Sequence, residues 1–132
     1  LVELLEAEDP VAAPPAPRPA PSLAGAEVRL EDVTFRYPSR PVTPALDGVS
    51  LALRPGETVA LVGPSGGGKS TVLQLLLRFW DPQGGRVTIG GTDLRDLRRA
   101  EVRAQMALVP QDPAIFADTA RENIRFGRPE AS

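Results

Sequence analysis

Hydrophobic residues in this sequence fall in short runs that are separated by glycine, proline and charged residues. Apolar and polar side chains alternate over residues 28–35, with one break near Glu31-Asp32, which predicts a β-strand with a local irregularity. The alternation in residues 49–53 predicts a second strand. Residues 38–44, bounded by prolines, predict a loop between the two.

Two further runs, 58–62 and 106–109, are almost wholly apolar. Such runs are typical of strands that a parallel sheet buries on both faces, so we expect two core strands. Residues 54–57, Arg-Pro-Gly-Glu, predict a tight turn that leads into the first of them. Residues 86–89 predict another strand, which ends at the Gly90-Gly91 turn.

Three segments predict helices. Residues 71–78 carry apolar side chains around most of the helical circumference, which predicts a helix that is packed on most of its faces. Residues 97–105 predict a short helix whose mixed arginines and acids form a solvated face, and residues 119–125 predict one or two turns. We interpret Phe79 and Trp80 as core or cover residues rather than as ligands for a base.

The N-terminal region differs in composition from the rest. Residues 1–9 are acidic with scattered leucines, as at the end of a preceding helix, and residues 10–21 hold six of the fifteen prolines. A chain of this kind is extended and reaches at most about 37 Å at roughly 3.1 Å per residue. We therefore predict a tether over residues 1–26 and a folded module over 27–132. A proline-rich ligand for a recognition domain is the alternative.

The segment between the first apolar run and the long helix matches Gly-x-x-x-x-Gly-Lys-Ser, the phosphate-binding P-loop. Its residues are Gly63, Pro64, Ser65, Gly66, Gly67, Gly68, Lys69 and Ser70, and the predicted nucleotide site also includes Thr71. Glycines let the chain wrap around an anion, so that backbone N–H groups and the helix N-terminus point at it. Lys69 would reach the β- and γ-phosphates, and the Ser70 hydroxyl would ligate Mg²⁺. A glycine-rich surface turn that matches by accident is the alternative, but strand, glycine loop and helix are the context that the motif demands.

The composition excludes several kinds of chemistry. Of 132 residues none is cysteine or histidine, so there is no disulfide, thiolate metal site, cysteine nucleophile or histidine base. The net charge is −2 and no basic stripe suggests nucleic acid. No apolar run approaches the roughly 20 residues of a membrane span, and no signal peptide is evident. Because residue 1 is leucine and the last residues form no terminal element, we expect a piece of a longer polypeptide with sequence missing on both sides.

Several segments occur in a specific order and at specific separations. They are Phe35-Arg36-Tyr37-Pro38, residues 46–51, the P-loop, residues 81–85 with Gly90-Gly91, Val109-Pro110-Gln111-Asp112, and residues 121–127. This ordered set resembles the nucleotide-binding domain of ATP-binding cassette (ABC) transporters of the exporter type, and the resemblance covers residues 27–130. Asp118 stands where the family usually has a small residue, and we attach no functional meaning to it.

The resemblance implies an α/β fold, the P-loop NTPase core of ABC-type ATPases with an N-terminal antiparallel β subdomain. Tyr37 falls at the family's A-loop position, where an aromatic ring stacks on adenine; a half-buried tyrosine at a strand end is the alternative. Gln111 falls at the Q-loop, where the amide helps to ligate Mg²⁺ and senses the transmembrane domain; a polar loop residue is the alternative.

Family members continue with a helical subdomain bearing a Leu-Ser-Gly-Gly-Gln signature, a Walker B strand that ends in Asp and the catalytic Glu, and a switch histidine. This sequence contains none of them. We therefore expect it to bind ATP and Mg²⁺ without hydrolysing ATP at a useful rate, and to be marginally stable or prone to aggregation. The implied partners of the parent are a second nucleotide-binding domain, in a homodimer or heterodimer, and a transmembrane domain of the same polypeptide. The implied location is the cytoplasmic face of the membrane.

Three other hypotheses are open. A soluble ABC ATPase that acts on nucleic acid or ribosomes would predict a methionine close to the first strand and a more basic surface. A P-loop kinase of small molecules would need an acceptor-binding lid and has no reason to carry the Tyr37 and Gln111 segments. The third is a non-catalytic nucleotide-binding or assembly module. The tether before Glu27 favours the exporter.

Overall fold

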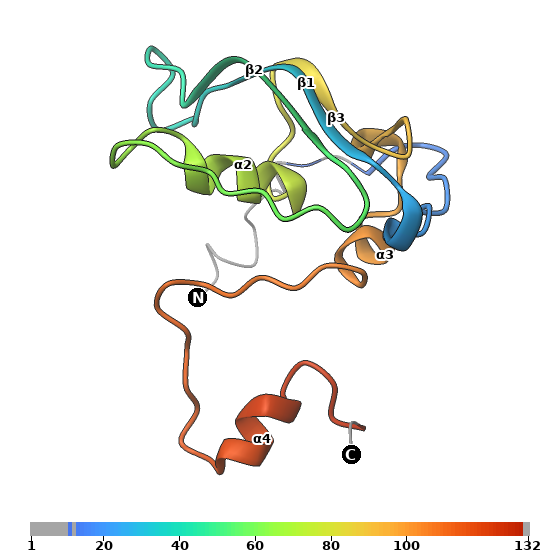
Figure 1. Cartoon of the computed structure of the whole chain (residues 1–132), viewed down its shortest axis with the longest axis vertical. Coiled ribbons are helices and arrows are strands. Elements are labelled where there is room, and N and C mark those ends of the chain that lie inside the picture. The colour runs from blue at the N-terminus through green and yellow to red at the C-terminus, as the bar shows by residue number, and fades with distance from the viewer. Residues whose placement is uncertain (1–10, 12, 131–132) are drawn as a thin grey trace.

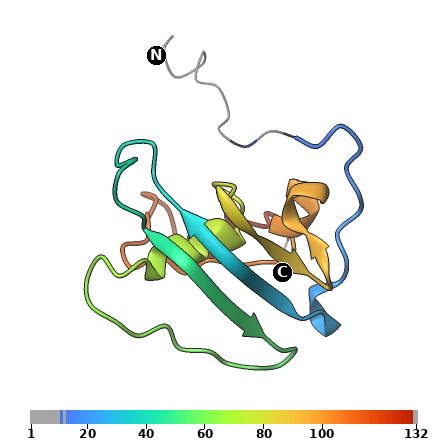
Figure 2. The same ribbon diagram turned by 90° about the horizontal axis from the view of Figure 1, so that it is seen from above.

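In the computed structural model, one antiparallel sheet covers one long helix (Figures 1 and 2). The structure describes residue 11 and residues 13–130, so the helix end expected at residues 1–9 lies outside the described residues. The strands are β1 (Val28–Phe35), β2 (Leu46–Leu53), β3 (Gly84–Ile89) and β4 (Thr92–Asp93), in the order β2-β1-β3-β4. The helices are α2 (Lys69–Leu76), α3 (Arg99–Arg103) and α4 (Ala120–Arg125), with 3₁₀ turns η1 (Leu23–Gly25) and η2 (Leu94–Asp96).

The sheet confirms the irregularity that the sequence predicts in β1. β1 pairs with β2 in register from Val28 opposite Leu53, and the register shifts between Leu30 and Val33. The pairing of β1 with β3 shifts at the same place, where Asp32 has a φ of 50°. An extra residue in one strand of an antiparallel pair produces such a bulge and explains the break in alternation.

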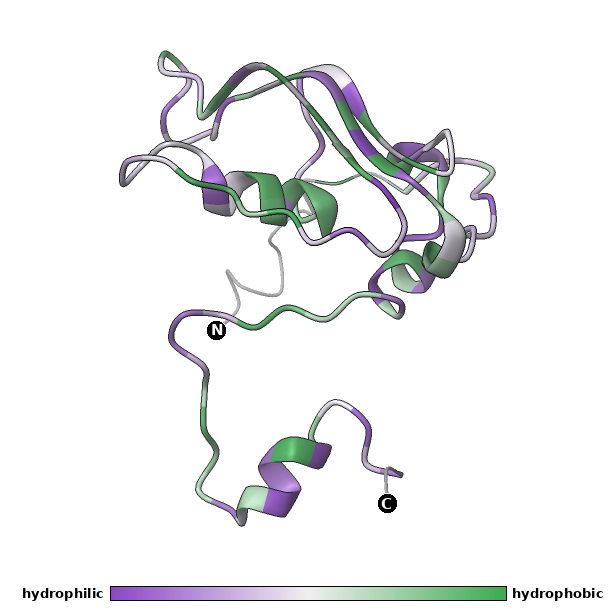
Figure 3. Ribbon diagram, in the orientation of Figure 1, coloured by the Kyte–Doolittle hydropathy of each residue, from purple (hydrophilic) through white to green (hydrophobic). Residues whose placement is uncertain are grey.

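The core lies between the sheet and α2. Side chains of β1 and β3 that point to one face pack against the buried face of α2. The core cluster includes Leu30, Val33, Phe35, Val87 and Ile89 from the strands and Val72 and Leu75 from α2. Trp80 packs on this core beside Phe35, with ring centroids 6.0 Å apart, as a cover residue is expected to do. Figure 3 shows the apolar colouring of α2 beneath the sheet.

Helix α2 differs from its prediction in position. It spans Lys69–Leu76 rather than residues 71–78, because Gly68 ends the loop in a left-handed conformation and serves as the N-cap. Thr71, Val72 and Leu75 are buried, but Leu73 is 43% exposed. Gln74, Leu76 and Leu77 are half-buried and Arg78 is buried, so most of the predicted segment is packed, as expected, and Leu73 is its exposed position.

The end of α2 also corrects the interpretation of the arginines as a solvated face. The Arg103 guanidinium donates to the carbonyl oxygens of Leu77 at 2.8 Å and Arg78 at 2.9 Å, and it lies 4.6 Å from the centre of the Phe79 ring. A cation at the C-terminal end of a helix stabilises carbonyls that have no partner within the helix. Arg98 keeps the predicted exposed position, with half of its side chain in solvent.

The two apolar runs predicted as core strands are exposed chain. Residues 58–62 and 106–109 are assigned to no strand, and Val62 and Val109 are 89% and 90% exposed. A strand that is buried on both faces requires a neighbouring strand on at least one side, and among residues 11 and 13–130 neither run has one. Apolar character alone did not decide the structure of either run.

We expect this exposed apolar surface to make the chain associate with itself. Val62, Val109, Ile115 and Ile124 are each at least 80% exposed, and large apolar side chains in contact with water favour association where they gather in a patch. Sedimentation velocity at increasing concentration should show oligomers at neutral pH, and a Val62→Asp, Val109→Asp double variant should show fewer. A monomeric chain that melts sharply and cooperatively without ligand would contradict this prediction.

The remaining predicted elements agree with the structure to different degrees. The loop at 38–44 and the turn at 54–57 are confirmed, the latter by a 3.1 Å hydrogen bond from the Glu57 amide to the Arg54 carbonyl. The helix predicted at 97–105 is shorter, and the one at 119–125 is present as α4, with Thr119 as its N-cap. The sequence pattern did not predict β4 or η2.

Ordered contacts begin before Glu27, the residue at which we expected the folded module to start. The Arg18 amide donates to the Asp96 carbonyl at 2.8 Å, so the proline-rich segment lies against the module. Its role as a tether to another domain stays a prediction. None of the helices in the described part of the chain has the length and hydrophobicity needed to cross a bilayer.

Candidate functional site

The glycine-rich loop reaches α2 through a position that only glycine can occupy. Gly68 has a φ of +80°, and a Cβ there would lie 2.5 Å from the Ala45 carbonyl oxygen and 2.7 Å from a Leu46 methyl carbon. The loop closes on itself through a 3.1 Å bond from the Gly67 amide to the Pro64 carbonyl. The loop therefore wraps closely around the start of α2, against the beginning of β2.

Lys69 stands at the first helical position and turns back over the loop. Its Nζ donates to the carbonyl oxygens of Gly63 at 2.9 Å and Pro64 at 2.7 Å. An ammonium group has three N–H donors, so this arrangement leaves one for an anion. The amides of Lys69, Ser70 and Thr71 belong to the first turn of α2, whose N–H groups have no acceptor within the helix. Together these groups form the type of cradle that binds phosphate.

Tyr37 lies beside this turn, at the end of β1. Its hydroxyl is 3.0 Å from the Thr71 hydroxyl and donates to the Gln74 side-chain carbonyl at 3.0 Å. Its ring meets Phe35 edge to face, with centroids 4.8 Å apart, and Trp80 likewise at 5.9 Å. Two hydrogen bonds and two ring contacts fix the orientation of the tyrosine relative to the loop.

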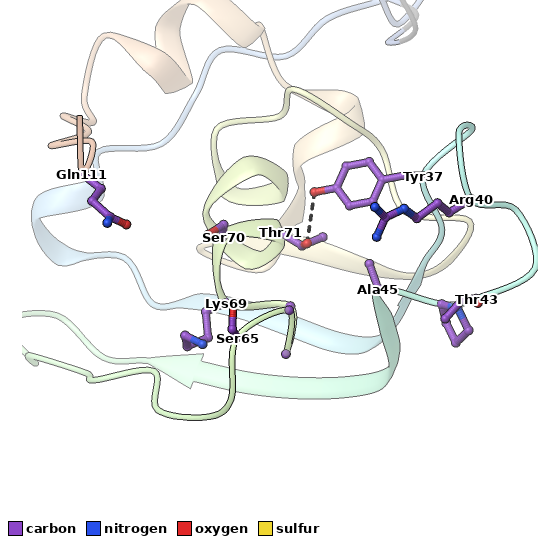
Figure 4. A pocket seen from close by; sticks show the side chains of 13 residues that line it. Tyr37, Arg40, Thr43, Ala45, Ser65, Lys69, Ser70, Thr71 and Gln111 are labelled. Carbon is purple, nitrogen blue, oxygen red and sulfur yellow. Dashed lines mark hydrogen bonds between the residues drawn. The ribbon is translucent and has the colours of Figure 1, made fainter. Parts of the chain in front are cut away.

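These groups surround one cavity of about 440 Å³ (Figure 4). Nine predicted site residues line it: Tyr37, Ser65, Gly66, Gly67, Gly68, Lys69, Ser70, Thr71 and Gln111. Gly63 and Pro64 do not line it, but their carbonyls hold Lys69. The cavity also has four lining residues that the sequence did not single out, Arg40, Thr43, Pro44 and Ala45.

Arg40 is the most informative of these four residues. Its amide donates to the Tyr37 carbonyl at 2.8 Å, which forms the turn after β1, and Figure 4 shows its side chain directed toward Tyr37. The cavity lining thus has two cations, Arg40 and Lys69, and no carboxylate. This balance of charge favours an anionic ligand.

Ser70 and Gln111 line the same cavity from α2 and from the segment after α3, respectively (Figure 4). Both offer a neutral oxygen ligand. Mg²⁺ binds hard oxygen donors, keeps several of its waters and is commonly held between a few protein groups and substrate phosphates. A hydroxyl and an amide beside a phosphate cradle fit such an ion. Among the described residues, no group of three or more acidic side chains offers an alternative metal site.

Comparison with known proteins identifies the family to which the chain belongs. Residues 46–132 match the sequence profile of the ABC transporter family. The chain belongs to that family. The P-loop ATPase core that the sequence predicts, with its antiparallel β subdomain, is thereby confirmed as the fold class.

Relatives include proteins that are named for multidrug resistance or as ABC transporters. Over 100 residues the chain is 55% identical to multidrug resistance protein 3 of Entamoeba histolytica, an alignment that covers 76% of the chain and 8% of that protein. Over 112 residues it is 46% identical to ABC transporter B family member 3 of Dictyostelium discoideum, covering 85% of the chain and 8% of that protein.

The fold matches a solved structure described as a bacterial Atm1-family ABC exporter with ATP bound. The TM-score is 0.87 at 40% sequence identity, and the match covers 98% of the chain and 22% of the exporter chain. The present ABC transporter chain therefore spans less than a quarter of each of these proteins.

Proposed function

We propose that this ABC transporter chain binds ATP together with Mg²⁺ in the cavity between Tyr37 and the P-loop. The observation that carries the proposal is the position of Lys69, which lies over the loop carbonyls at the first turn of α2. Two cations and the amides of the helix terminus all face a cavity that has no acidic lining residue. A polyphosphate matches this arrangement better than a neutral or cationic ligand does.

The roles of the residues follow from their positions. Lys69 exchanges its bonds to the loop carbonyls for bonds to the β- and γ-phosphates, and the first-turn amides bind the same group. The Tyr37 ring, fixed by its bonds to Thr71 and Gln74, offers a surface on which the adenine stacks. Ser70 and Gln111 are the residues that would hold Mg²⁺, and the ion would neutralise phosphate charge there.

The described residues bind nucleotide but do not supply a base for hydrolysis. Hydrolysis requires a group that orients the attacking water next to the γ-phosphate. No carboxylate lines the cavity among the described residues, and Gln111 cannot accept a proton as a base does. We infer that the complete transporter hydrolyses ATP with groups that lie outside these 132 residues.

We further propose that the parent polypeptide is an exporter at the cytoplasmic face of a membrane. Its partners would be a transmembrane domain of the same polypeptide and a second nucleotide-binding domain. The names of the relatives, multidrug resistance proteins, and the likeness to an ATP-bound exporter support this proposal. Nucleic acid is not an expected partner, because the net charge is −2.

The stacking role of Tyr37 is tested by two substitutions. We expect Tyr37→Ala to weaken ATP and GTP to a similar extent, by roughly 1–3 kcal/mol, because stacking on an aromatic ring depends little on the identity of the base. Tyr37→Phe is the matched control, since it keeps the ring and loses only the hydroxyl bonds to Thr71 and Gln74. Calorimetric titration measures both affinities.

A large loss for one nucleotide and not for the other would argue for hydrogen-bond recognition of the base. Equal affinities for unmodified chain and Tyr37→Ala would make Tyr37 the half-buried structural tyrosine that the sequence also allows.

A further inference from the structure

The proline-rich N-terminal segment is attached to the module by backbone pairing. The Arg18 amide donates to the Asp96 carbonyl at 2.8 Å, and the Arg98 amide donates to the Arg18 carbonyl at 2.9 Å. Arg18 thereby forms a parallel bridge with Leu97, which is buried in the core. Figures 1 and 2 both show this blue segment passing beside the orange elements η2 and α3.

Two side chains of the α3 region extend the attachment beyond this bridge. The Glu101 carboxylate accepts a hydrogen bond from the Ala20 amide at 2.9 Å. The Gln105 amide group accepts from the Leu23 amide at 2.9 Å and donates to the Pro21 carbonyl at 3.2 Å. Residues four positions apart lie on one face of a helical turn, so Glu101 and Gln105 face the segment together.

The composition of the segment suits this surface. Pro19 and Pro21 have no N–H and keep the chain extended, so few amides need a partner and little conformational entropy is lost on docking. The N–H groups that remain in the segment have acceptors: the amides of Arg18, Ala20 and Leu23 donate to the Asp96 carbonyl, the Glu101 carboxylate and the Gln105 side chain, respectively. Ala20 and Leu23 also pack against the hydrophobic core.

Charge strengthens the bond to Ala20. Glu101 also pairs with Arg98 at 2.9 Å. The hydrogen bonds from the Arg98 side chain and the Ala20 amide hold the pKa of the Glu101 carboxyl below its ordinary value. The carboxylate therefore stays ionised at neutral pH, and hydrogen bonds to an ionised acceptor are stronger than those between neutral groups.

We propose that Glu101 and Gln105 form an anchor that holds residues 18–23 of the same chain on α3. The anchor joins residues 18–23 to η2 and α3 before the chain reaches β1. Gln105 lies six positions before Gln111, which lines the nucleotide cavity.

Amide hydrogen exchange of the full chain without nucleotide tests the anchor, and its outcome does not depend on whether the chain binds ATP. We expect the Ala20 and Leu23 amides to be protected in the unmodified chain. Loss of a bond to a charged acceptor in Glu101→Ala should speed exchange at Ala20 about tenfold or more. Gln105→Ala should do the same at Leu23, and Glu101→Gln, which keeps an acceptor, should have an intermediate effect.

Glu122→Ala on α4 is the matched control and should change neither amide. Amides of β1, such as that of Leu30, should keep their protection in every variant. Exchange at Ala20 as fast as in a free peptide, or exchange that is unchanged in Glu101→Ala, would overturn the anchor. Simultaneous loss of protection in β1 would also overturn it, because Glu101 would then support the whole fold and not this segment.

Discussion

The Lys69→Ala variant is expected to bind no measurable ATP. In the structure Lys69 lies over the phosphate cradle and lines a cavity with one other cation, Arg40. Losing a charged contact to a phosphate typically costs about 1.5–3 kcal/mol, or roughly tenfold to a hundredfold in affinity. Since the site has no contribution from a second nucleotide-binding domain in the isolated chain, that loss should bring binding below detection in a calorimeter.

Arg54→Ala is the matched control for the change in net charge. Arg54 is exposed in the turn before residues 58–62 and does not line the cavity, so this variant should bind ATP as the unmodified chain does. Undiminished binding by Lys69→Ala would remove the lysine from its assigned role. Equal losses in both variants would show that net charge, and not the position of Lys69, governs binding.

The largest loss of stability is expected from Gly85→Ala. Gly85 has a φ of +71° and lies where the pairing of β1 with β3 shifts register. A Cβ at this position would collide with the carbonyl oxygens of Glu31 and Asp32, which are backbone atoms of the bulge and cannot rotate away. Strain of this kind, together with displacement of a central strand pair, should lower the free energy of unfolding by roughly 3–5 kcal/mol.

Gly91→Ala is the control that separates the cost of the steric collision from the cost of a positive φ at alanine. Gly91 has a φ of +79°, close to that of Gly85, but a Cβ there meets nothing within 4 Å. The control should cost only the roughly 1–2 kcal/mol of a left-handed alanine. Fluorescence of Trp80, the only tryptophan, reports the state of the core at low micromolar concentration. Equal stability of the two variants would contradict the steric argument.

Local sequence signals predicted the parts of the fold that depend on neighbouring residues. The glycine spacing of the P-loop placed the phosphate cradle, because a backbone conformation with positive φ at Gly66 and Gly68 is encoded by those residues themselves. The alternation in residues 28–35 predicted β1 together with its bulge. The N-cap of α4 at Thr119 is also a local signal, since its hydroxyl accepts from the Glu122 amide.

The sequence did not predict the parts of the structure that depend on residues far away along the chain. Residues 58–62 and 106–109 have the hydrophobicity of core strands, but hydrophobicity does not supply the adjacent strand whose backbone completes the hydrogen bonds. The proline content of residues 10–21 predicted an extended chain and gave no sign of the surface on α3 that binds it. Arg103 was interpreted as solvated because its acceptors, the carbonyls of Leu77 and Arg78 just after α2, lie more than 20 positions away.

The candidate site was predicted more completely than the fold. Nine of its residues belong to the P-loop, to the segment around Gln111 or to the segment around Tyr37, and each of these segments has a characteristic local sequence. Arg40 was missed because a single arginine in a proline-bounded loop carries no periodicity and belongs to no motif. The loop lies at the cavity because it connects β1 to β2 beside the P-loop, an arrangement that depends on the tertiary fold.

Acylation of Lys69 tests phosphate binding most directly, because Lys69 is the only lysine of the sequence. An amine-reactive reagent can modify only this side chain and the N-terminal amine, and mass spectrometry distinguishes the two. We predict that Mg²⁺ with ATP slows the acylation of Lys69 at least tenfold, that adenosine does not, and that the N-terminal amine reacts equally in all samples. Equal rates for Lys69 with and without millimolar ATP would contradict the account.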